Sequence, residues 1–141
     1  VSRFVSGIFL QASCGVFVCG YHTYWKPQIT SGREMHIIFR YADSRERVVT
    51  ASVGDNLLRV AQANDINGIP GDCGGQCACG TCHVYIDPVW AARIGNVEPG
   101  STEEAMIFGA PVDARPTSRL ACQIDLTAHH DGLIVDVPEG Q

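Results

Sequence analysis

The chain has 141 residues, which is enough for one domain and hardly enough for two. Hydrophobic residues make up 45% and charged residues 18%, values that allow a buried core and argue against wholesale disorder. The formal net charge of −5 disfavours binding to a nucleic-acid backbone, and the absence of an apolar run of about 18 residues disfavours a membrane span.

The first 34 residues differ in composition from the rest. Residues 1–34 carry a net charge of +2, whereas residues 35–141 carry seven Arg, no Lys and fourteen Asp and Glu, a net charge of −7. The sequence from Met35, MHIIFRY, is typical of a first strand. We therefore divide the chain into an N-terminal extension, residues 1–34, outside the fold and one domain, residues 35–141.

Three interpretations of the extension compete. We favour the interpretation that the extension is an upstream segment with no part in the chemistry, so that Cys14 and Cys19 have no role. A secretory signal or anchor would use Arg3 as its positive start and Ile8–Cys19 as its apolar stretch. An organellar transit peptide fits less well, because Arg3 is the only arginine among the first 25 residues.

The domain opens with a predicted hairpin and a helix. Met35–Tyr41 and Glu46–Ala51 are short apolar segments separated by a polar turn, a pattern that favours two paired strands. Apolar residues then recur at helical spacing from Leu57 to Ala61, and Asp55 is expected to cap the start of this helix.

Glycine and proline break the chain before a second group of elements. Asn67-Gly68 and Pro70-Gly71 predict a loop that continues through the cysteine-rich run. The elements expected beyond it are a strand at His83–Ile86, helices at Pro88–Ile94 and Thr102–Phe108, and strands at Leu120–Leu126 and Leu133–Val137. Strands and helices mix without βαβ regularity, so the expected class is α+β.

Cysteines dominate the middle of the domain. Cysteines 73, 77, 79 and 82 lie within ten residues, and Cys122 follows at a distance. A disulfide framework fits poorly, because near neighbours bridge awkwardly and the domain has a core. Cys79-Gly80-Thr81-Cys82 is a literal C-x-x-C, but it runs into a strand instead of heading a helix, so a thioredoxin-like pair is disfavoured. One C-x-x-C with scattered cysteines also matches structural zinc poorly.

An iron–sulfur cluster accounts for the spacing best. Cys73, Cys79 and Cys82 would come from one loop and Cys122 from a strand, which supplies the four thiolates of a [2Fe–2S] centre. Cys77 is then a spare thiol inside the loop.

The residues between these cysteines are small. Gly74, Gly75 and Gly80 would let the backbone approach closely, so that peptide N–H groups could point at the sulfurs. We expect these glycines to support the cluster loop.

At this point the sequence resembles the adrenodoxin/putidaredoxin-type [2Fe–2S] ferredoxins. The similarity rests on C-x₅-C-x₂-C…C, on Thr81-Cys82-His83, on the SRLACQ run of residues 118–123, and on GLIVDVP at residues 132–138. It covers residues 35–141 and implies the β-grasp ferredoxin fold, a mixed sheet with short helices and a cluster-binding loop. Plant-type spacing has four residues between the first two ligands and does not match.

The resemblance implies an electron-transfer protein rather than an enzyme. Such a protein holds one [2Fe–2S] cluster, accepts electrons from an FAD-containing, NAD(P)H-dependent ferredoxin reductase and passes them to a cytochrome P-450 monooxygenase. Iron–sulfur cluster assembly or another oxygenase remain alternative acceptors, and a zinc-stabilised or dithiol module remains the other class. Free thiolates predict a reducing compartment, the cytoplasm if the extension is not a signal, and we expect a monomer.

Acidic residues are expected to dock the partners. The resemblance indicates Asp72, before the first ligand, and Glu103 and Glu104 at the start of a helix, with Glu98 and Asp113 as weaker candidates. Each could instead be a solvated or helix-capping charge.

Other residues are expected to act structurally. His83 is predicted to support the cluster loop as a hydrogen-bonding core residue, and Arg119 to pair with a carboxylate. His129-His130 are placed in a surface turn, and Trp90 is expected to pack its helix on the sheet. Gly109-Ala110-Pro111 should end the last helix early.

Overall fold

A computed structural model describes residues 33–141. The expectations for the extension, including those for Arg3, Cys14 and Cys19, lie outside the described residues. The first strand begins at Glu34, one residue before the predicted start of the domain. The division of the chain at residues 34 and 35 stays a prediction.

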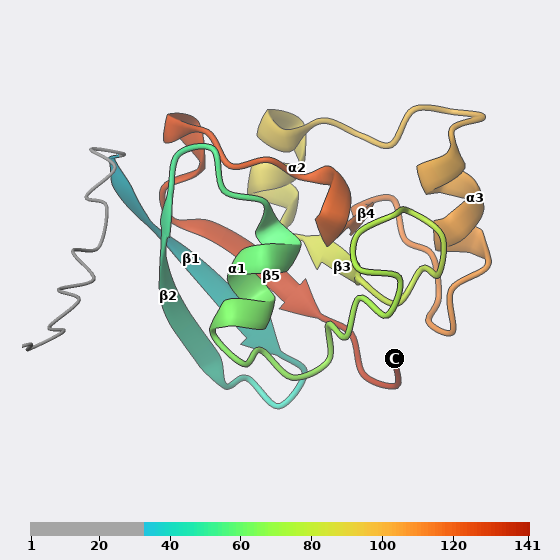
Figure 1. Ribbon diagram of the computed structural model, residues 1–141, viewed down its shortest axis with the longest axis horizontal. Helices are drawn as coiled ribbons and strands as arrows, with labels where there is room; N and C mark the ends of the chain where they lie inside the picture. Colours follow the sequence, from blue (N-terminus) through green and yellow to red (C-terminus); the bar gives the residue numbers. More distant parts are fainter. Residues whose placement is uncertain (1–32) are drawn as a thin grey trace, which may run out of the picture.

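Five strands form one mixed sheet in the order β2-β1-β5-β3-β4 (Figure 1). They are β1 (Glu34–Tyr41), β2 (Glu46–Ser52), β3 (His83–Ile86), β4 (Ser118–Leu120) and β5 (Leu133–Val137). Strand β1 pairs antiparallel with β2 and parallel with β5, and the other neighbours are antiparallel. The sheet and its short helices confirm the α+β class.

The predicted hairpin is confirmed. Side chains alternate along β1, where Met35, Ile37 and Phe39 are buried and the residues between them are not. Ile37 is paired with Val49 of β2, which is also buried. The alternation therefore turns one face of the hairpin toward the core.

Helix α1 (Leu57–Ala63) lies across one face of the sheet and buries Leu57, Leu58 and Ala61 (Figure 1). The prediction that Asp55 caps this helix is wrong. Asn56 is the cap, and its side chain accepts a hydrogen bond from the Leu58 N–H at 3.1 Å. The Asp55 carboxylate instead accepts from the Ser52 N–H at 2.8 Å and closes the turn after β2.

The two later helices begin and end as predicted. Helix α2 (Pro88–Ile94) packs Trp90 against the core, and α3 (Thr102–Phe108) is capped by Ser101 and ends before Gly109. No helix among residues 33–141 has the length and apolar character needed to cross a bilayer.

The predicted strand at Leu120–Leu126 is wrong in its extent. Strand β4 ends at Leu120, and Ala121–Gln123 form a short 3₁₀ turn. The Ala121 N–H donates to the Cys82 carbonyl at 2.9 Å, and the Ile124 N–H donates back to the Ala121 carbonyl. These bonds bend the chain where a strand would have continued, so Cys122 lies on a turn and not on a strand.

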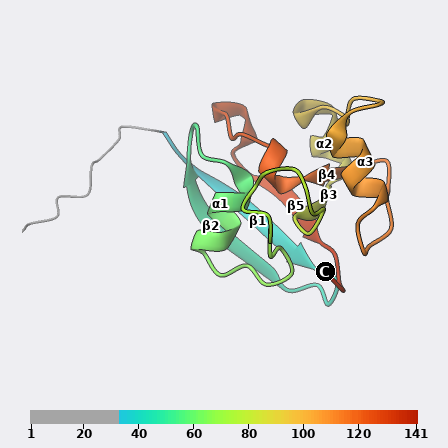
Figure 2. The same ribbon diagram turned by 45° about the vertical axis from the view of Figure 1, so that its right-hand side comes forward.

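The loop at residues 69–82 lies between α1 and α3, an arrangement that two views show alike (Figures 1 and 2). A Cβ built on Gly75 would contact Leu58 of α1 at 3.6 Å. One built on Gly80, where φ is +71°, would meet the Met106 carbonyl of α3 at 2.8 Å. Only glycine fits at that second contact, so α3 can close directly on the loop.

Candidate metal centre

Two of the predicted ligands form a pair inside the loop. The backbone N–H of Cys73 donates to the Cys79 sulfur at 3.4 Å, and the Cys79 side chain helps to lower the pKa of the Cys73 thiol. The Thr81 hydroxyl lies 3.1 Å from the same Cys79 sulfur. Both cysteines are half-buried.

Cys82 and Cys122 form a second pair. Cys82 is 1% exposed at the start of β3, and Cys122 sits on the 3₁₀ turn after β4. The backbone and side chain of Cys122 are among the groups that act on the pKa of the Cys82 thiol, so the two residues lie close together. The hydrogen bond from Ala121 to the Cys82 carbonyl holds the two chain segments together.

The protonation of the two pairs differs. Peptide N–H groups of the loop, first that of Ala78, lower the pKa of Cys73 to about 6, with help from the Cys79 thiol. Burial raises the pKa of Cys82 to about 12. Metal binding at Cys82 would therefore displace a proton, whereas Cys73 is readily a thiolate.

The donors fit a [2Fe–2S] cluster. Such a centre needs two thiolates at each iron, and the four cysteines form two pairs. The N–H groups of Gly75, Gln76 and Ala78 already point at the Cys73 sulfur, as required to stabilise negative charge there. Within residues 33–141, no three Cys, His, Asp or Glu side chains gather as a single metal ion would need.

Cys77 shares this space. It has a positive φ of 53°, is half-buried, and its thiol hydrogen-bonds with that of Cys122. Burial raises its pKa, the opposite direction from Cys73. Its place as a spare thiol stays a prediction.

His83 is fully buried at the base of the loop. Its Nε2 lies 2.7 Å from the Ser118 hydroxyl of β4, and burial lowers the pKa of the imidazole to about 4. The ring is therefore neutral and ties β3 to β4 as a hydrogen-bonding core residue.

The predicted ion pair of Arg119 is confirmed, and its partner is Glu103. The Arg119 Nε donates to the Glu103 carboxylate at 2.8 Å, and both side chains are 12% exposed. The same carboxylate accepts from the Leu120 N–H at 2.9 Å. Glu103 thus fastens α3 to β4, and its docking role stays a prediction.

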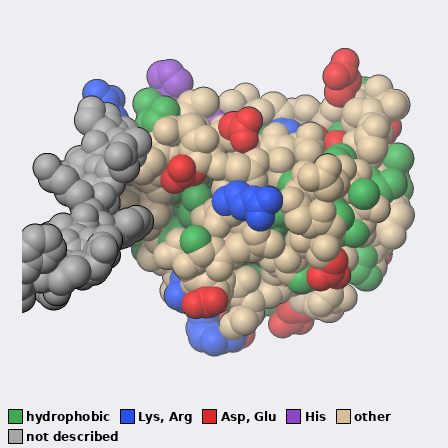
Figure 3. Space-filling view, in the orientation of Figure 1, with side chains coloured by type: hydrophobic (Ala, Val, Ile, Leu, Met, Phe, Trp, Pro, Cys, Tyr) green, Lys and Arg blue, Asp and Glu red, His purple; other side chains and the backbone are tan. Residues whose placement is uncertain are grey.

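The other acidic residues are more accessible. Asp72, Glu98 and Asp113 are exposed, and Glu104 is half-buried with its carboxylate accepting from the Gly100 N–H at 2.7 Å. Charged side chains are spread over the face seen in Figure 3, where apolar ones gather at the end of the molecule that holds α3. Phe108, the last residue of α3, is 73% exposed.

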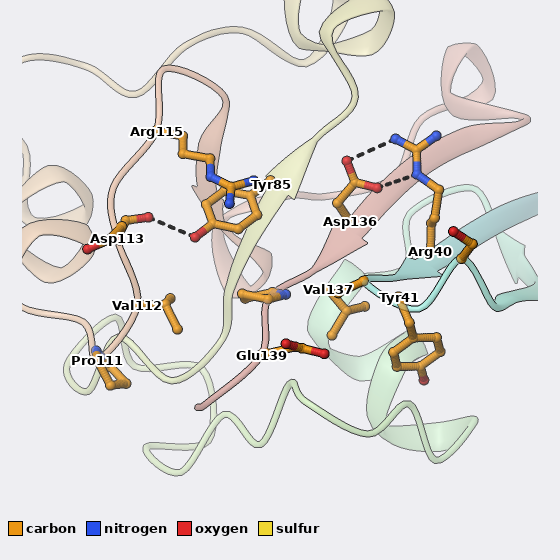
Figure 4. Close-up of a pocket in the computed structure, with 13 residues that line it drawn as sticks. Arg40, Tyr41, Tyr85, Pro111, Val112, Asp113, Arg115, Asp136, Val137 and Glu139 are labelled. Carbon is orange, nitrogen blue, oxygen red and sulfur yellow. Dashed lines mark hydrogen bonds and ion pairs between the residues drawn. The ribbon is translucent and has the colours of Figure 1, made fainter.

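A groove of about 580 Å³ lies apart from the cysteines, none of which is among its lining residues in the described part of the chain (Figure 4). Both of its arginine side chains are engaged. Arg40 donates to Asp136 at 2.9 Å, and Arg115 stacks 3.9 Å over the ring of Tyr85. The Tyr85 hydroxyl donates to the Asp113 carbonyl at 2.8 Å. These contacts therefore give the groove a structural role between β5 and the segment that leads into β4.

The structure adds two contacts to the loop that the sequence did not indicate. Arg59 of α1 donates to the Gly74 carbonyl at 2.9 Å. The side chain of Gln141 reaches both Gly68 and His83. Neither residue belongs to a recognisable motif, so neither could be found from spacing. His130, predicted at the surface, is 7% exposed because its Nδ1 accepts from the Thr127 N–H and its ring turns inward.

Comparison with known proteins shows that the domain described above resembles proteins that bind an iron–sulfur cluster. The model of the 2Fe-2S iron-sulfur cluster binding domain matches residues 41–127. The chain is 39% identical to ferredoxin CarAc of a Sphingomonas species over 108 residues, 77% of this chain and 96% of that one. The crystal structure of a ferredoxin from Rhodopseudomonas palustris HaA2 superposes with a TM-score of 0.71 at 38% identity, covering 75% and 98% of the two chains. Putidaredoxin in its covalent complex with putidaredoxin reductase gives 0.69 at 33% identity, covering 74% and 99%.

Proposed function

Because the chain belongs to the [2Fe–2S] ferredoxins of the adrenodoxin and putidaredoxin type, we propose that it shuttles single electrons from an FAD-containing, NAD(P)H-dependent reductase to a cytochrome P-450 monooxygenase. Members of this family are electron carriers and not enzymes. The chain has the β-grasp ferredoxin fold and binds one [2Fe–2S] cluster.

The observation that carries the proposal is that Cys122, on the turn after β4, lies beside Cys82 at the end of the loop that holds Cys73 and Cys79. We assign Cys73 and Cys79 to one iron and Cys82 and Cys122 to the other. When bound, the cluster accepts and releases one electron. The loop's peptide N–H groups stabilise the thiolate charge, and the buried Cys82 keeps water from one side of the site.

A reductase is the proposed electron source. One solved relative is a putidaredoxin bound covalently to putidaredoxin reductase, and this chain matches 99% of that ferredoxin's length. A ferredoxin needs no flavin or nicotinamide site of its own if a reductase supplies the electrons.

Charge supports transient docking. Residues 35–141 carry a net charge of −7, and a cluster of formal charge −2 would bring this to −9. Long-range attraction to a basic partner surface speeds encounter, while a small wet interface permits release. Of the three docking residues expected from the sequence we retain Asp72, which is exposed beside the first ligand, and Glu104. The buried ion pair gives Glu103 a structural role instead.

The ligand assignment is tested with two serine variants of the full chain. Cys77→Ser should keep the visible absorption and the low-temperature EPR signal that appears after dithionite. Cys122→Ser should lose both, because one iron would lack a thiolate. Retained colour in the Cys122 variant would refute the assignment, and a colourless wild-type protein with bound zinc would favour the zinc module.

The partners are tested by electron flow. The oxidised protein should be reduced by NADPH or NADH only when a ferredoxin reductase is added, and Asp72→Asn should slow that reduction at low salt. The reduced protein should then be reoxidised when it is mixed with a P-450 acceptor in a stopped-flow experiment. Transfer to a cluster-assembly system but not to any P-450 would favour the alternative acceptor.

A further inference from the structure

The last residue of the chain contacts the base of the cluster loop. The Gln141 side chain makes three hydrogen bonds: its Oε1 accepts from the His83 N–H at 3.1 Å, and its Nε2 donates to the carbonyls of His83 at 2.7 Å and Gly68 at 2.8 Å. Figures 1 and 2 both show the end of the chain beside this loop.

These partners stand at the two ends of the loop. Gly68 comes before residues 69–82 and His83 directly follows them, so one amide group joins the segment that enters the loop to the strand that leaves it. Three of the four proposed ligands lie between the two contacts.

The peptide unit that joins Cys82 to His83 is held from both sides. Its carbonyl accepts from the Ala121 N–H at 2.9 Å, next to the fourth proposed ligand. Its N–H donates to the Gln141 side chain and to the Gly80 carbonyl at 3.2 Å. Movement of the Gln141 amide would therefore shift the backbone of Cys82 directly.

The path of the tail keeps this amide in place. Val137 and Pro138 are buried, and a Cβ on Gly68, where φ is +93°, would lie 2.7 Å from the Val137 side chain. The tail is thus packed against the loop entrance before it reaches Gln141, which is itself half-buried. The side chain loses little further freedom in making its three bonds.

We propose that Gln141 is a positioning residue for the cluster, whose carboxamide clamps the two ends of the cluster loop and holds the Cys82 backbone in its ligating place. This inference rests on the proposed ligand set. An open loop would expose the cluster to water and let a thiolate leave its iron, so the clamp should govern how long the cluster is retained and how uniformly it is held.

The test compares Gln141→Ala with Glu139→Ala in the full, cluster-loaded chain. Glu139 lies in the same tail and is exposed, so its variant controls for a change near the chain end. Cluster loss is followed as bleaching of the visible absorption in the presence of an iron chelator at 25 °C. Loss of three hydrogen bonds should accelerate bleaching at least about fivefold in the Gln141 variant and leave the control unchanged.

Two further measurements separate positioning from simple stability. The EPR signal of the reduced Gln141→Ala protein should shift or broaden, and the His83 amide should exchange faster with deuterium. Gln141→Glu preserves size and the acceptor but turns a carboxylate oxygen toward two carbonyls, so it should lose the cluster at least as fast.

A lower unfolding midpoint with an unchanged EPR signal and bleaching rate would overturn the inference. So would equal bleaching rates in the Gln141 and Glu139 variants. A colourless wild-type protein would overturn the proposed function together with this inference, whereas a coloured wild type with an indifferent Gln141→Ala variant overturns the inference alone.

Discussion

Glu103→Ala should destabilise the domain strongly, because its carboxylate has three donors in a closed site. Arg119 donates from Nε at 2.8 Å and from Nη2 at 3.3 Å, and the Leu120 N–H donates at 2.9 Å. Both side chains of the ion pair are 12% exposed. Removing the carboxylate would leave a guanidinium and a peptide N–H without this acceptor.

The expected magnitude follows from these contacts. Breaking one side of a buried ion pair costs about 3–5 kcal/mol, and an orphaned N–H adds to that cost. Arg119 retains its bond to the Gly95 carbonyl at 2.8 Å, which argues for the lower end. We therefore expect a loss of about 3 kcal/mol in the free energy of unfolding, or a fall of more than about 10 °C in the midpoint.

The assay is thermal unfolding of cluster-loaded protein by circular dichroism, at one fixed scan rate because cluster loss makes unfolding irreversible. Glu104→Ala is the matched control, since within residues 33–141 its carboxylate accepts a hydrogen bond only from the Gly100 N–H, and its loss should cost about 1 kcal/mol. In a double-mutant cycle with Arg119→Ala, the fall in midpoint of the double variant should be clearly smaller than the sum of the two single falls. Equal midpoints for the Glu103 and Glu104 variants would refute the buried-pair reasoning and return Glu103 to the docking surface.

Two other predictions concern charge. Arg59→Gln should make the reduction potential of the cluster more negative by on the order of 20 mV, which corresponds to about 0.5 kcal/mol at an exposed site. The reason is that the Arg59 cation, which donates to the Gly74 carbonyl, would no longer offset the charge of the added electron. A redox titration checks this with Arg93→Gln as the control, and equal potentials in the two variants would contradict it. Burial lowers the pKa of His130 below 6.5, so the neutral ring contributes stability that is complete above pH 6.5 and declines as the pH falls below it. His130→Asn should flatten that decline in unfolding midpoints measured from pH 8 to pH 5, and an unchanged slope would show that another group is responsible.

Local patterns predicted most of the elements. The apolar segment Met35–Tyr41 predicted β1, and the two later helices begin at the predicted residues Pro88 and Thr102, because each signal lies within one turn or one strand of the residue that it controls. The cysteine spacing likewise predicts Cys73, Cys79, Cys82 and Cys122 as the ligand set, and that assignment stays a prediction.

The errors came from contacts with distant parts of the chain. Leu120–Leu126 was predicted as one strand from its composition, but the backbone of Cys82, 39 residues before Ala121, accepts the hydrogen bond that starts the turn. The cap at Asn56 prevailed over Asp55 in the same way, because the Asn56 amide also donates to the Cys122 carbonyl at 3.0 Å. Propensity alone cannot rank two neighbouring polar residues when a partner 66 residues away decides between them.

Glu103 shows the same limit at the level of function. Acidic residues at the start of a helix suit both docking and capping, and the sequence favoured docking for Glu103 and Glu104 alike. Both residues are half-buried, but their partners differ: Glu103 pairs with Arg119 of β4, whereas Glu104 accepts from the Gly100 N–H. The resemblance gave the helix and its charge, whereas the direction of each side chain required the packed structure.

The parallel pairing of β1 with β5 has a consequence for co-translational folding. Ile37 and Leu133 are partners in the sheet, so the first strand to emerge waits for the last before its inner edge is filled. Until then the β1 edge of the hairpin is unpaired. No completed sheet yet holds Cys122 in position relative to the loop that carries the other three cysteines. Iron and sulfide delivery should therefore follow the emergence of β5, and a nascent chain stalled before β5 should fail to acquire colour.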